Sequence, residues 1–449
     1  MKKIRIGCGA GCSFDRLEPA IELVEKGDID YIVFECLAER TIANNQQQKL
    51  KDPSKGYTPM LEPRMRGILK QAKENEVKIV TNMGAANPSA AVDIILKVAK
   101  ELNITNIKVA MVSGDDLTHN LEKYKSMVMW QSTKTLGELD AEIISANVYL
   151  GAEAIKEALD NGADIVITGR VADVALFVGP MMHEFGWTEN DLHKIGQATL
   201  LGHLLECGGQ VTGGYFADPG YKDVENLHIL GHPIAEIDET GDFIVTKVKG
   251  SGGEVSPRTC KEQLLYEITD PACYITPNAM VDFTNVNFKQ VEKDVVLVTG
   301  AVSKGVPDTY KVNIGYCDCY IGEGEVSFGG LNSLSRAKLC ADIIEKRLEI
   351  VKANIDEYRV DYIGYNSLYK TNISDRFAPE EHSEIRLRIS GRTKTYEDAM
   401  LISQELDYLY TNGPAGSSGV ESRVRQVLSI GAMIIPKEDI ATDITYWEV

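Results

Sequence analysis

Short apolar runs alternate with segments of helical periodicity between residues 3 and 168. Near-continuous apolar runs are typical of buried strands, whereas apolar residues that recur every three or four positions are typical of helices. The apolar runs predict strands at 3–7, 31–36, 78–82, 107–113 and 164–168, and the periodic segments predict helices at 16–25, 64–76, 88–102 and 151–161. Strands and helices that alternate at this spacing favour an α/β fold with a doubly wound, mostly parallel, Rossmann-like sheet.

Three polar residues are expected to cap helices in this half of the chain. Asn87 precedes Pro88, and an asparagine followed by a proline in the first turn marks a helix start. Asp15 with Glu18 fits a capping box, in which a polar N-cap residue is followed three positions later by a carboxylate. Asp173 is interpreted as the cap of the next helix.

The pattern changes in the second half of the chain. A helix is predicted at 189–207, followed by a glycine-rich loop at 208–220, and a strand at 243–248 enters a second glycine loop at 249–253. Later strands are predicted at 294–303, 310–320, 358–368, 384–392 and near 424–435, with helices at 333–352 and 395–411. Two helices against hairpin-connected strands predict a smaller α+β domain. The expected domains are therefore 1–290, an α/β domain with a helical and glycine-loop insertion, and 291–449.

Composition excludes several classes of protein. The chain has 47 basic and 66 acidic residues, a net charge of −19, which disfavours nucleic acid as a partner. Its nine cysteines are scattered and odd in number, which argues against a disulfide framework and for a reducing compartment. No apolar run approaches the length of a membrane helix, and the first residues lack the apolar core of a signal peptide. We expect a cytoplasmic protein that binds neither nucleic acid nor membranes.

The predicted helix at 189–207 carries the most distinctive candidate chemistry. It is apolar nearly all round, as a buried helix is. His203 and Glu206 lie three residues apart on one side of it, and Cys207 follows directly. Leaving one partner of a buried ionic pair alone costs roughly 3–5 kcal/mol, so both groups need partners in the protein or in a ligand. A satisfied structural pair and a catalytic pair both remain open at this point.

Glycines and polar residues follow several of the predicted strands. Ligands of open α/β sheets bind beyond the carboxyl ends of the strands, and helix N-termini favour anions. The expected substrate-binding residues are Gly9, Gly11, Ser13, Asp15 and Arg16 of the first loop, Glu35, Asn87 and Arg170 of later loops, Gln210 and Thr212 after helix 189–207, and Lys247 and Gly252 of the second glycine loop.

Each of these residues also has a structural interpretation. Arg170 can pair with Asp173, Glu35 can belong to an ion-pair cluster, and the segment around Lys247 can be a simple hairpin turn. A nicotinamide cofactor is disfavoured, because the third glycine of the dinucleotide fingerprint is replaced by Cys12. The sequence specifies no cofactor and no metal ligands, although a divalent metal stays open as a cofactor.

Seven sequence blocks in order resemble the acyclic terpene utilisation (AtuA) family. These blocks are IGCGAG with the following DR, DYIVFECLAERT, NMGAANP, TGRVADV, GHLLECGGQVTGG, TKV with GSGG, and NGPAG. The family takes its name from a bacterial pathway that degrades citronellol and geraniol through acyl-CoA intermediates, and many members are paired with or fused to a small second component. The resemblance therefore implies a catabolic enzyme without implying a particular reaction.

We predict a lyase, either a hydro-lyase or a carbon–carbon lyase, that acts on a hydroxylated acyl-CoA or polycarboxylate. His203 is the expected base, with Glu206 orienting it or acting as the acid, and Cys207 is a less favoured nucleophile. Arg170, Asn87 and the amides of the first loop are expected to hold carboxylates. The alternatives are a non-catalytic subunit of a two-component enzyme that binds an acyl-CoA or acid, and an NAD(P)-dependent oxidoreductase. A homo-oligomer is expected.

Overall fold

The computed structural model describes residues 2–379 and 381–449. The chain forms two compact units, unit 1 (Met1–Gly315 and Ile430–Val449) and unit 2 (Tyr316–Ser429). This division does not coincide with the expected boundary at residue 290. The reason is that unit 2 is inserted between two long strands, β14 (Thr309–Gly329) and β17 (Ser417–Pro436), each of which begins or ends in unit 1.

Unit 1 contains a ten-stranded sheet in the order β11-β12-β8-β7-β1-β2-β3-β6-β4-β18. Its strands are β1 (Lys3–Ala10), β2 (Tyr31–Phe34), β3 (Lys78–Thr81), β4 (Lys108–Ser113), β6 (Ile165–Thr168), β7 (Pro233–Asp238), β8 (Phe243–Lys247), β11 (Asn287–Glu292), β12 (Val295–Thr299) and β18 (Asp443–Glu448). Neighbours from β1 to β4 pair in parallel, while the pairs at both edges are antiparallel. The α/β class is confirmed, but the sheet is mixed rather than mostly parallel, because strands from the later part of the chain extend it at both edges.

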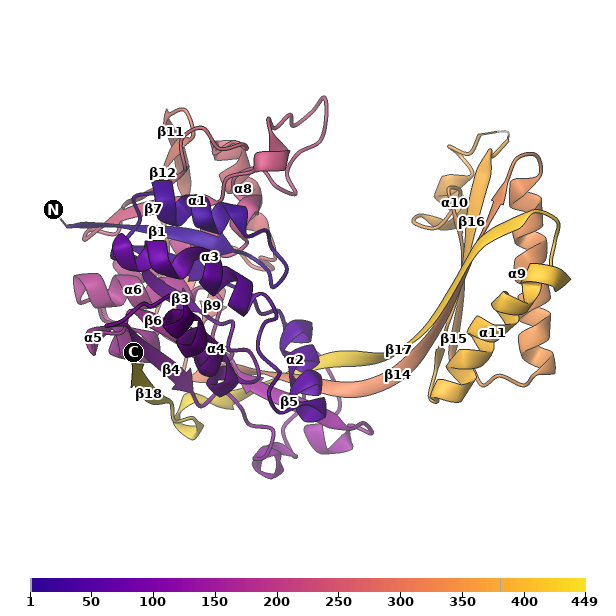
Figure 1. Ribbon diagram of the computed structural model, residues 1–449, viewed down its shortest axis with the longest axis horizontal. Coiled ribbons are helices and arrows are strands. Elements are labelled where there is room, and N and C mark those ends of the chain that lie inside the picture. The colour runs from indigo at the N-terminus through magenta and orange to yellow at the C-terminus, as the bar shows by residue number, and fades with distance from the viewer. Residues whose placement is uncertain (1, 380) are drawn as a thin grey trace. The chain divides into compact units, whose positions relative to one another are not determined.

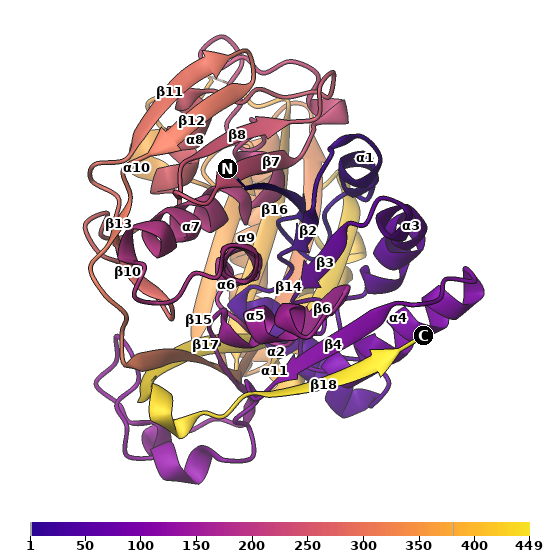
Figure 2. The same ribbon diagram turned by 90° about the vertical axis from the view of Figure 1, so that its left-hand side faces the viewer.

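Helices lie on both faces of the central strands. Figure 2 shows α1 and α3 on one face and α6 and α7 on the other. Every residue of β2 is buried, as expected for a strand that is covered on both sides. The helices of unit 1 are α1 (Glu18–Lys26), α2 (Glu39–Lys51), α3 (Leu61–Glu74), α4 (Pro88–Glu101), α5 (Glu153–Asp160), α6 (Ala175–Phe185), α7 (Leu192–Leu205) and α8 (Pro257–Leu265).

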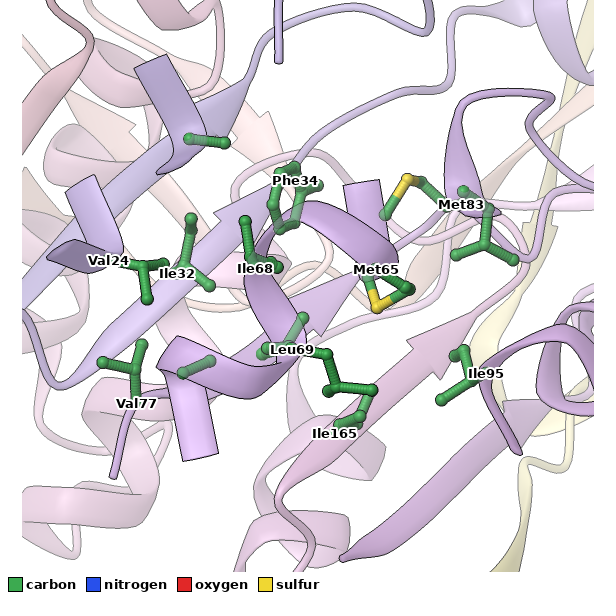
Figure 3. Packing of buried hydrophobic residues seen from close by; sticks show 14 of the residues in the cluster. Val24, Ile32, Phe34, Met65, Ile68, Leu69, Val77, Met83, Ile95 and Ile165 are labelled. Carbon is green, nitrogen blue, oxygen red and sulfur yellow. The ribbon is translucent and has the colours of Figure 1, made fainter. Parts of the chain in front are cut away.

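A hydrophobic core between α1, α3, α4 and the sheet fixes the ends of the central strands. Phe34 and Ile32 of β2 pack against Met65, Ile68 and Leu69 of α3, and all five are at most 1% exposed (Figure 3). Burying each of these side chains contributes roughly 1.5–3 kcal/mol. The loops that follow β1, β2 and β3 therefore start from a rigid base.

The helix starts agree only in part with the caps expected from the sequence. The Asn87 side chain accepts a hydrogen bond from the Ala90 amide, so its role as the N-cap of α4 is confirmed. The capping box at α1 is wrong, because Asp15 Oδ2 instead accepts a hydrogen bond from the Gly11 amide at 2.9 Å. Asp173 does not cap α6, because its carboxylate pairs with Arg170.

Unit 2 is built from two interleaved β-α-β segments. In the chain order β14, α9 (Ser333–Ile350), β15 (Glu357–Ile363), α10 (Lys370–Ser374), β16 (Glu384–Thr393), α11 (Tyr396–Asn412) and β17, the strands form a sheet in the order β15-β16-β14-β17. Figure 1 shows α9 and α11 on the same face of this sheet. Their apolar sides bury Leu387 and Ile389 of β16 against Ile344 and Leu406.

Short strands complete the structure. A three-stranded sheet has the order β13-β10-β9, and β5 pairs with β14. These strands are β5 (Ile143–Val148), β9 (Tyr274–Thr276), β10 (Ala279–Asp282) and β13 (Val302–Ser303). Within residues 2–379 and 381–449, none of the helices has both the length and the apolar content needed to cross a bilayer.

Candidate functional site

A cavity of about 690 Å³ opens in unit 1 where the ends of β1 and β2 meet the end of α7. Its walls come from segments far apart in the sequence: the loop after β1, the segment that leads into α2, and the residues that follow α7 and α8. Seven of the residues expected to bind or transform substrate line it: Gly11, Asp15, Arg16, Glu35, Glu206, Cys207 and Gln210.

The end of α7 places Glu206, rather than His203, at the cavity. His203 Nδ1 lies 2.9 Å from Glu206 Oε1, and His203 Nε2 lies 3.1 Å from the Leu264 carbonyl oxygen. The His203 ring also stacks against Phe283, with 5.8 Å between ring centroids. Both ring nitrogens thus have protein partners, and the imidazole does not line the cavity. Glu206 does, and its second oxygen, Oε2, is buried without a hydrogen-bond partner.

The surroundings of His203 and Glu206 favour one proton shared between the imidazole and the carboxyl group near neutral pH. Because a carbonyl oxygen can only accept, His203 Nε2 carries a hydrogen, and one further proton lies between Nδ1 and Oε1. Burial raises the pKa of Glu206 to about 7, against the lowering effect of the hydrogen bond and charge of His203. Burial alone would lower the pKa of His203, but the hydrogen bond and charge of Glu206 raise it above its usual value.

Gly11 allows the end of β1 to reach the end of α7. A Cβ atom at this position would lie 2.2 Å from the Cys207 carbonyl carbon and 2.5 Å from the Gly208 amide nitrogen. Both are backbone atoms, which cannot move aside as a flexible side chain could. The close approach therefore requires glycine here, and it brings the loop after β1 against the residues that follow Glu206.

Carboxyl groups dominate the rest of the cavity wall. Burial, with the charge of Asp173, raises the pKa of Glu35 well above its usual range. Burial also raises the pKa of Asp173, although Arg170 lowers it. Glu39 behaves differently. Burial raises its pKa, but the hydrogen bond of the Tyr149 hydroxyl and the charge of the Lys311 ammonium outweigh burial, and the pKa falls to about 2.

The sequence matches the family described as acyclic terpene utilisation family protein AtuA over residues 4–446, nearly the whole chain. The chain belongs to this family. No curated protein matches it. Several of the sequence blocks that carry the family resemblance, including GHLLECGGQVTGG, supply residues of the cavity wall.

Arg170 of this AtuA family protein lies behind the cavity wall. It is 1% exposed, and its guanidinium donates to the Leu37 carbonyl oxygen and to the Asp173 carboxylate. The guanidinium carbon lies 3.9 Å from the centroid of the Tyr149 ring. The two terminal nitrogens thus have protein partners, whereas Nε is buried without one, and Arg170 forms an internal ion pair in this structure.

Other expected binding residues also have structural partners instead of a place in the wall. The Asn87 amide donates to the carbonyl oxygens of Pro53 and Lys55, and Thr212 Oγ1 donates to that of Gly231. Lys247 Nζ donates to the Ser251 carbonyl oxygen and pairs with Asp294 at 3.4 Å. Gly9 and Gly252 serve close packing, since a Cβ would lie 2.5 Å from Phe34 Cε1 and 2.0 Å from the Asn226 oxygen respectively. The structure does not place Ser13 in the cavity wall.

Sequence reasoning missed three groups of the cavity wall: Tyr266, Glu267 and His232. The first two follow α8, a helix that the sequence pattern did not predict. His232 Nδ1 lies 3.1 Å from the Cys8 carbonyl oxygen, and burial lowers the pKa of this imidazole. No sequence signal distinguishes these residues, because each reaches the wall only through the fold.

Two further expectations concern cysteine and metal chemistry. Burial, with the charge of Glu206, raises the pKa of the Cys207 thiol above its usual range, which disfavours it as a nucleophile. No group of three or more His, Cys, Asp or Glu side chains suited to a metal ion occurs in the described part of the chain.

Proposed function

We propose that this AtuA family protein is a lyase that works by general acid–base catalysis, with Glu206 as the group that exchanges a proton with the substrate. The observation that carries the proposal is the Glu206 carboxyl: the residue lines the cavity, and its Oε2 is buried without a hydrogen-bond partner among the described residues. A buried polar atom without a partner is costly, so such atoms in native sites call for an explanation. A pKa near the operating pH is the condition under which a group can both take and give a proton efficiently.

His203 acts through Glu206 in this proposal. Its two nitrogens bond to Glu206 and to the Leu264 carbonyl, so the ring has no nitrogen left for a substrate. It fixes the orientation of the carboxyl and stabilises its charged form. His203 is therefore a positioning residue, and the role of base assigned from the sequence passes to Glu206.

The charge of the wall favours a substrate whose reacting end is neutral. Arg16 is the one lysine or arginine among the described residues that line the cavity, whereas Asp15, Glu35, Glu39, Asp173, Glu206 and Glu267 are acidic. Two like charges about 4 Å apart repel by about 4 kcal/mol at an effective dielectric constant of about 20. Of the two predicted substrate classes, a hydroxylated acyl thioester avoids this repulsion at its reacting carbons, and a polycarboxylate does not.

The test is turnover of a panel of 3-hydroxyacyl thioesters and hydroxylated polycarboxylates by the wild type and by Glu206→Gln. The glutamine keeps the size of the side chain but cannot exchange a proton. We expect it to lower kcat by about 10²–10⁴-fold while the protein stays folded. Glu405→Gln is the matched control, because Glu405 is also buried but bonds to Arg347 in unit 2. Turnover by Glu206→Gln equal to that of the control would refute the proposal.

A further inference from the structure

We infer that Glu35 is a second catalytic residue, the acid that protonates the departing hydroxyl group while Glu206 removes the proton from carbon. This inference rests on the proposed function and extends it to a defined elimination of water. The sequence left Glu35 open as a member of an ion-pair cluster. That cluster was expected to hold Glu39 and Arg40. In the structure Glu39 pairs with Lys311, and Arg170, whose charge lowers the pKa of Glu35, forms its ion pair with Asp173, so none of the ion pairs of the described residues includes Glu35.

The end of β1 brings the two carboxyl groups to one cavity. The Glu35 amide donates to the Ala10 carbonyl oxygen at 3.1 Å, which ties the end of β2 to the end of β1. The next residue, Gly11, abuts the backbone of Cys207, directly after Glu206. Glu35 and Glu206 are thus held by adjacent residues of one strand end, and both line the cavity.

The hydrogen bonds of Glu35 direct its proton toward the second carboxyl oxygen. Oε1 accepts from the Leu37 amide at 2.8 Å and from Asn82 Nδ2 at 2.9 Å. Asn82 is itself fixed, since its Oδ1 accepts from the Cys36 amide at 2.7 Å. An oxygen that accepts two N–H groups behaves as the carbonyl oxygen of a carboxylic acid, which leaves Oε2 to carry the proton.

The electrostatics of the site agree with this arrangement. Burial and the charge of Asp173 raise the pKa of Glu35 well above its usual range, which favours its protonated form. Burial raises the pKa of Glu206 to about 7, so this group can supply a carboxylate in the same cavity near neutral pH. The different hydrogen bonds of the two carboxyl groups, two N–H donors to Glu35 Oε1 and the His203 ring at Glu206 Oε1, suit them to the roles of acid and base.

The step balances without a cofactor. The Glu206 carboxylate takes the proton next to the thioester carbonyl, and the electron pair of the C–H bond forms the carbon–carbon double bond. The C–O bond to the hydroxyl group breaks, and the hydroxyl leaves as water with the proton of Glu35. Glu206 ends protonated and Glu35 ionised, and exchange with solvent restores both. The product is an α,β-unsaturated acyl thioester.

A pair of leaving groups tests the inference. Hydroxide is a poor leaving group, so elimination of water needs an acid that protonates it. Fluoride is a weaker base than hydroxide, so its elimination from the matching 3-fluoroacyl thioester depends far less on an acid. We expect Glu35→Gln, which can keep the hydrogen bonds to Leu37 and Asn82, to slow loss of water by about 10²–10⁴-fold and loss of fluoride by less than about tenfold. Glu206→Gln should slow both, and Glu405→Gln neither.

The outcomes separate the inference from the proposed function. If Glu35→Gln slows neither reaction, or slows both equally while its circular dichroism spectrum is unchanged, the inference is overturned. If the wild type releases neither water nor fluoride, the proposed function fails and the inference fails with it. Should the glutamine variant not fold, Glu35→Asp replaces it: the shorter acid should slow loss of water more than loss of fluoride, and equal effects would count against Glu35.

Discussion

Glu206 links the stability of unit 1 to pH, and replacing it by glutamine should remove this link. The side chain is 8% exposed, and its pKa is raised from 4.5 to about 7. The folded state therefore binds a proton more tightly than the unfolded chain does. The contribution of this group to stability is fully present below pH 4.5, declines as the pH rises toward 7, and is then constant.

The size of the effect follows from the two pKa values. Relative to its value at low pH, the contribution of Glu206 to the free energy of unfolding of the wild type is smaller by about 1.4 kcal/mol at about pH 5.5 and by about 3.4 kcal/mol at about pH 8, a difference of about 2 kcal/mol. Glu206→Gln has no such loss. The raised pKa of His203 acts in the same direction, and Glu206 is its cause, so the variant removes that contribution too.

Urea unfolding measures this difference. All three tryptophans, Trp130, Trp187 and Trp447, lie in unit 1, so their fluorescence reports on this unit. We expect the free energy of unfolding of the wild type, relative to that of Glu206→Gln, to fall by about 2 kcal/mol between about pH 5.5 and about pH 8. A difference that is independent of pH, or one that grows in favour of the wild type, would refute the reasoning.

Three other substitutions test the structural roles around the cavity. Arg170→Met should lower the free energy of unfolding by about 1–3 kcal/mol, measured by urea titration, because it removes the hydrogen bonds of a buried guanidinium to the Leu37 carbonyl oxygen and to Asp173; an unchanged midpoint would contradict the internal ion pair. Gly11→Ala should lower turnover of the same thioesters at least tenfold, since a Cβ would lie 2.2 Å from the Cys207 backbone, and wild-type turnover would show that the wall tolerates it. Cys207→Ser should keep turnover within about tenfold, because the thiol pKa is raised; complete loss would restore the nucleophile hypothesis.

Much of the fold could be predicted from the local sequence pattern. The all-buried strand at 31–34 is a continuous apolar run, and the cap at Asn87 is marked by the proline that follows it. The antiparallel edges of the sheet could not be predicted, because alternation shows that a segment is a strand but not which strand lies beside it. Helix α2 (Glu39–Lys51) was missed because it is polar, and contacts of Glu39 with Tyr149 and Lys311 hold its start.

The candidate site was predicted as a set of segments but not as an assignment of roles. Spacing brought His203 and Glu206 together, yet it could not show that Glu206 lines the cavity and His203 does not. The Leu264 carbonyl oxygen, which engages the second ring nitrogen of His203, comes from a helix 61 residues further along the chain. For Arg170 the sequence offered the pairing with Asp173, which the structure confirms, but it carried no signal for the contact with the Leu37 carbonyl oxygen.

The measurement that tests the central claim most directly is the pH dependence of kcat/KM for a 3-hydroxyacyl thioester in the wild type and in His203→Gln. We expect the wild-type value to fall as the pH drops below about 7, because Glu206 becomes protonated. His203 lowers the pKa of Glu206, so replacing His203 should move the fall in kcat/KM on the acidic side of the profile to higher pH. If the fall in kcat/KM stays at the same pH in His203→Gln, or is still present in Glu206→Gln, Glu206 is not the group that exchanges the proton.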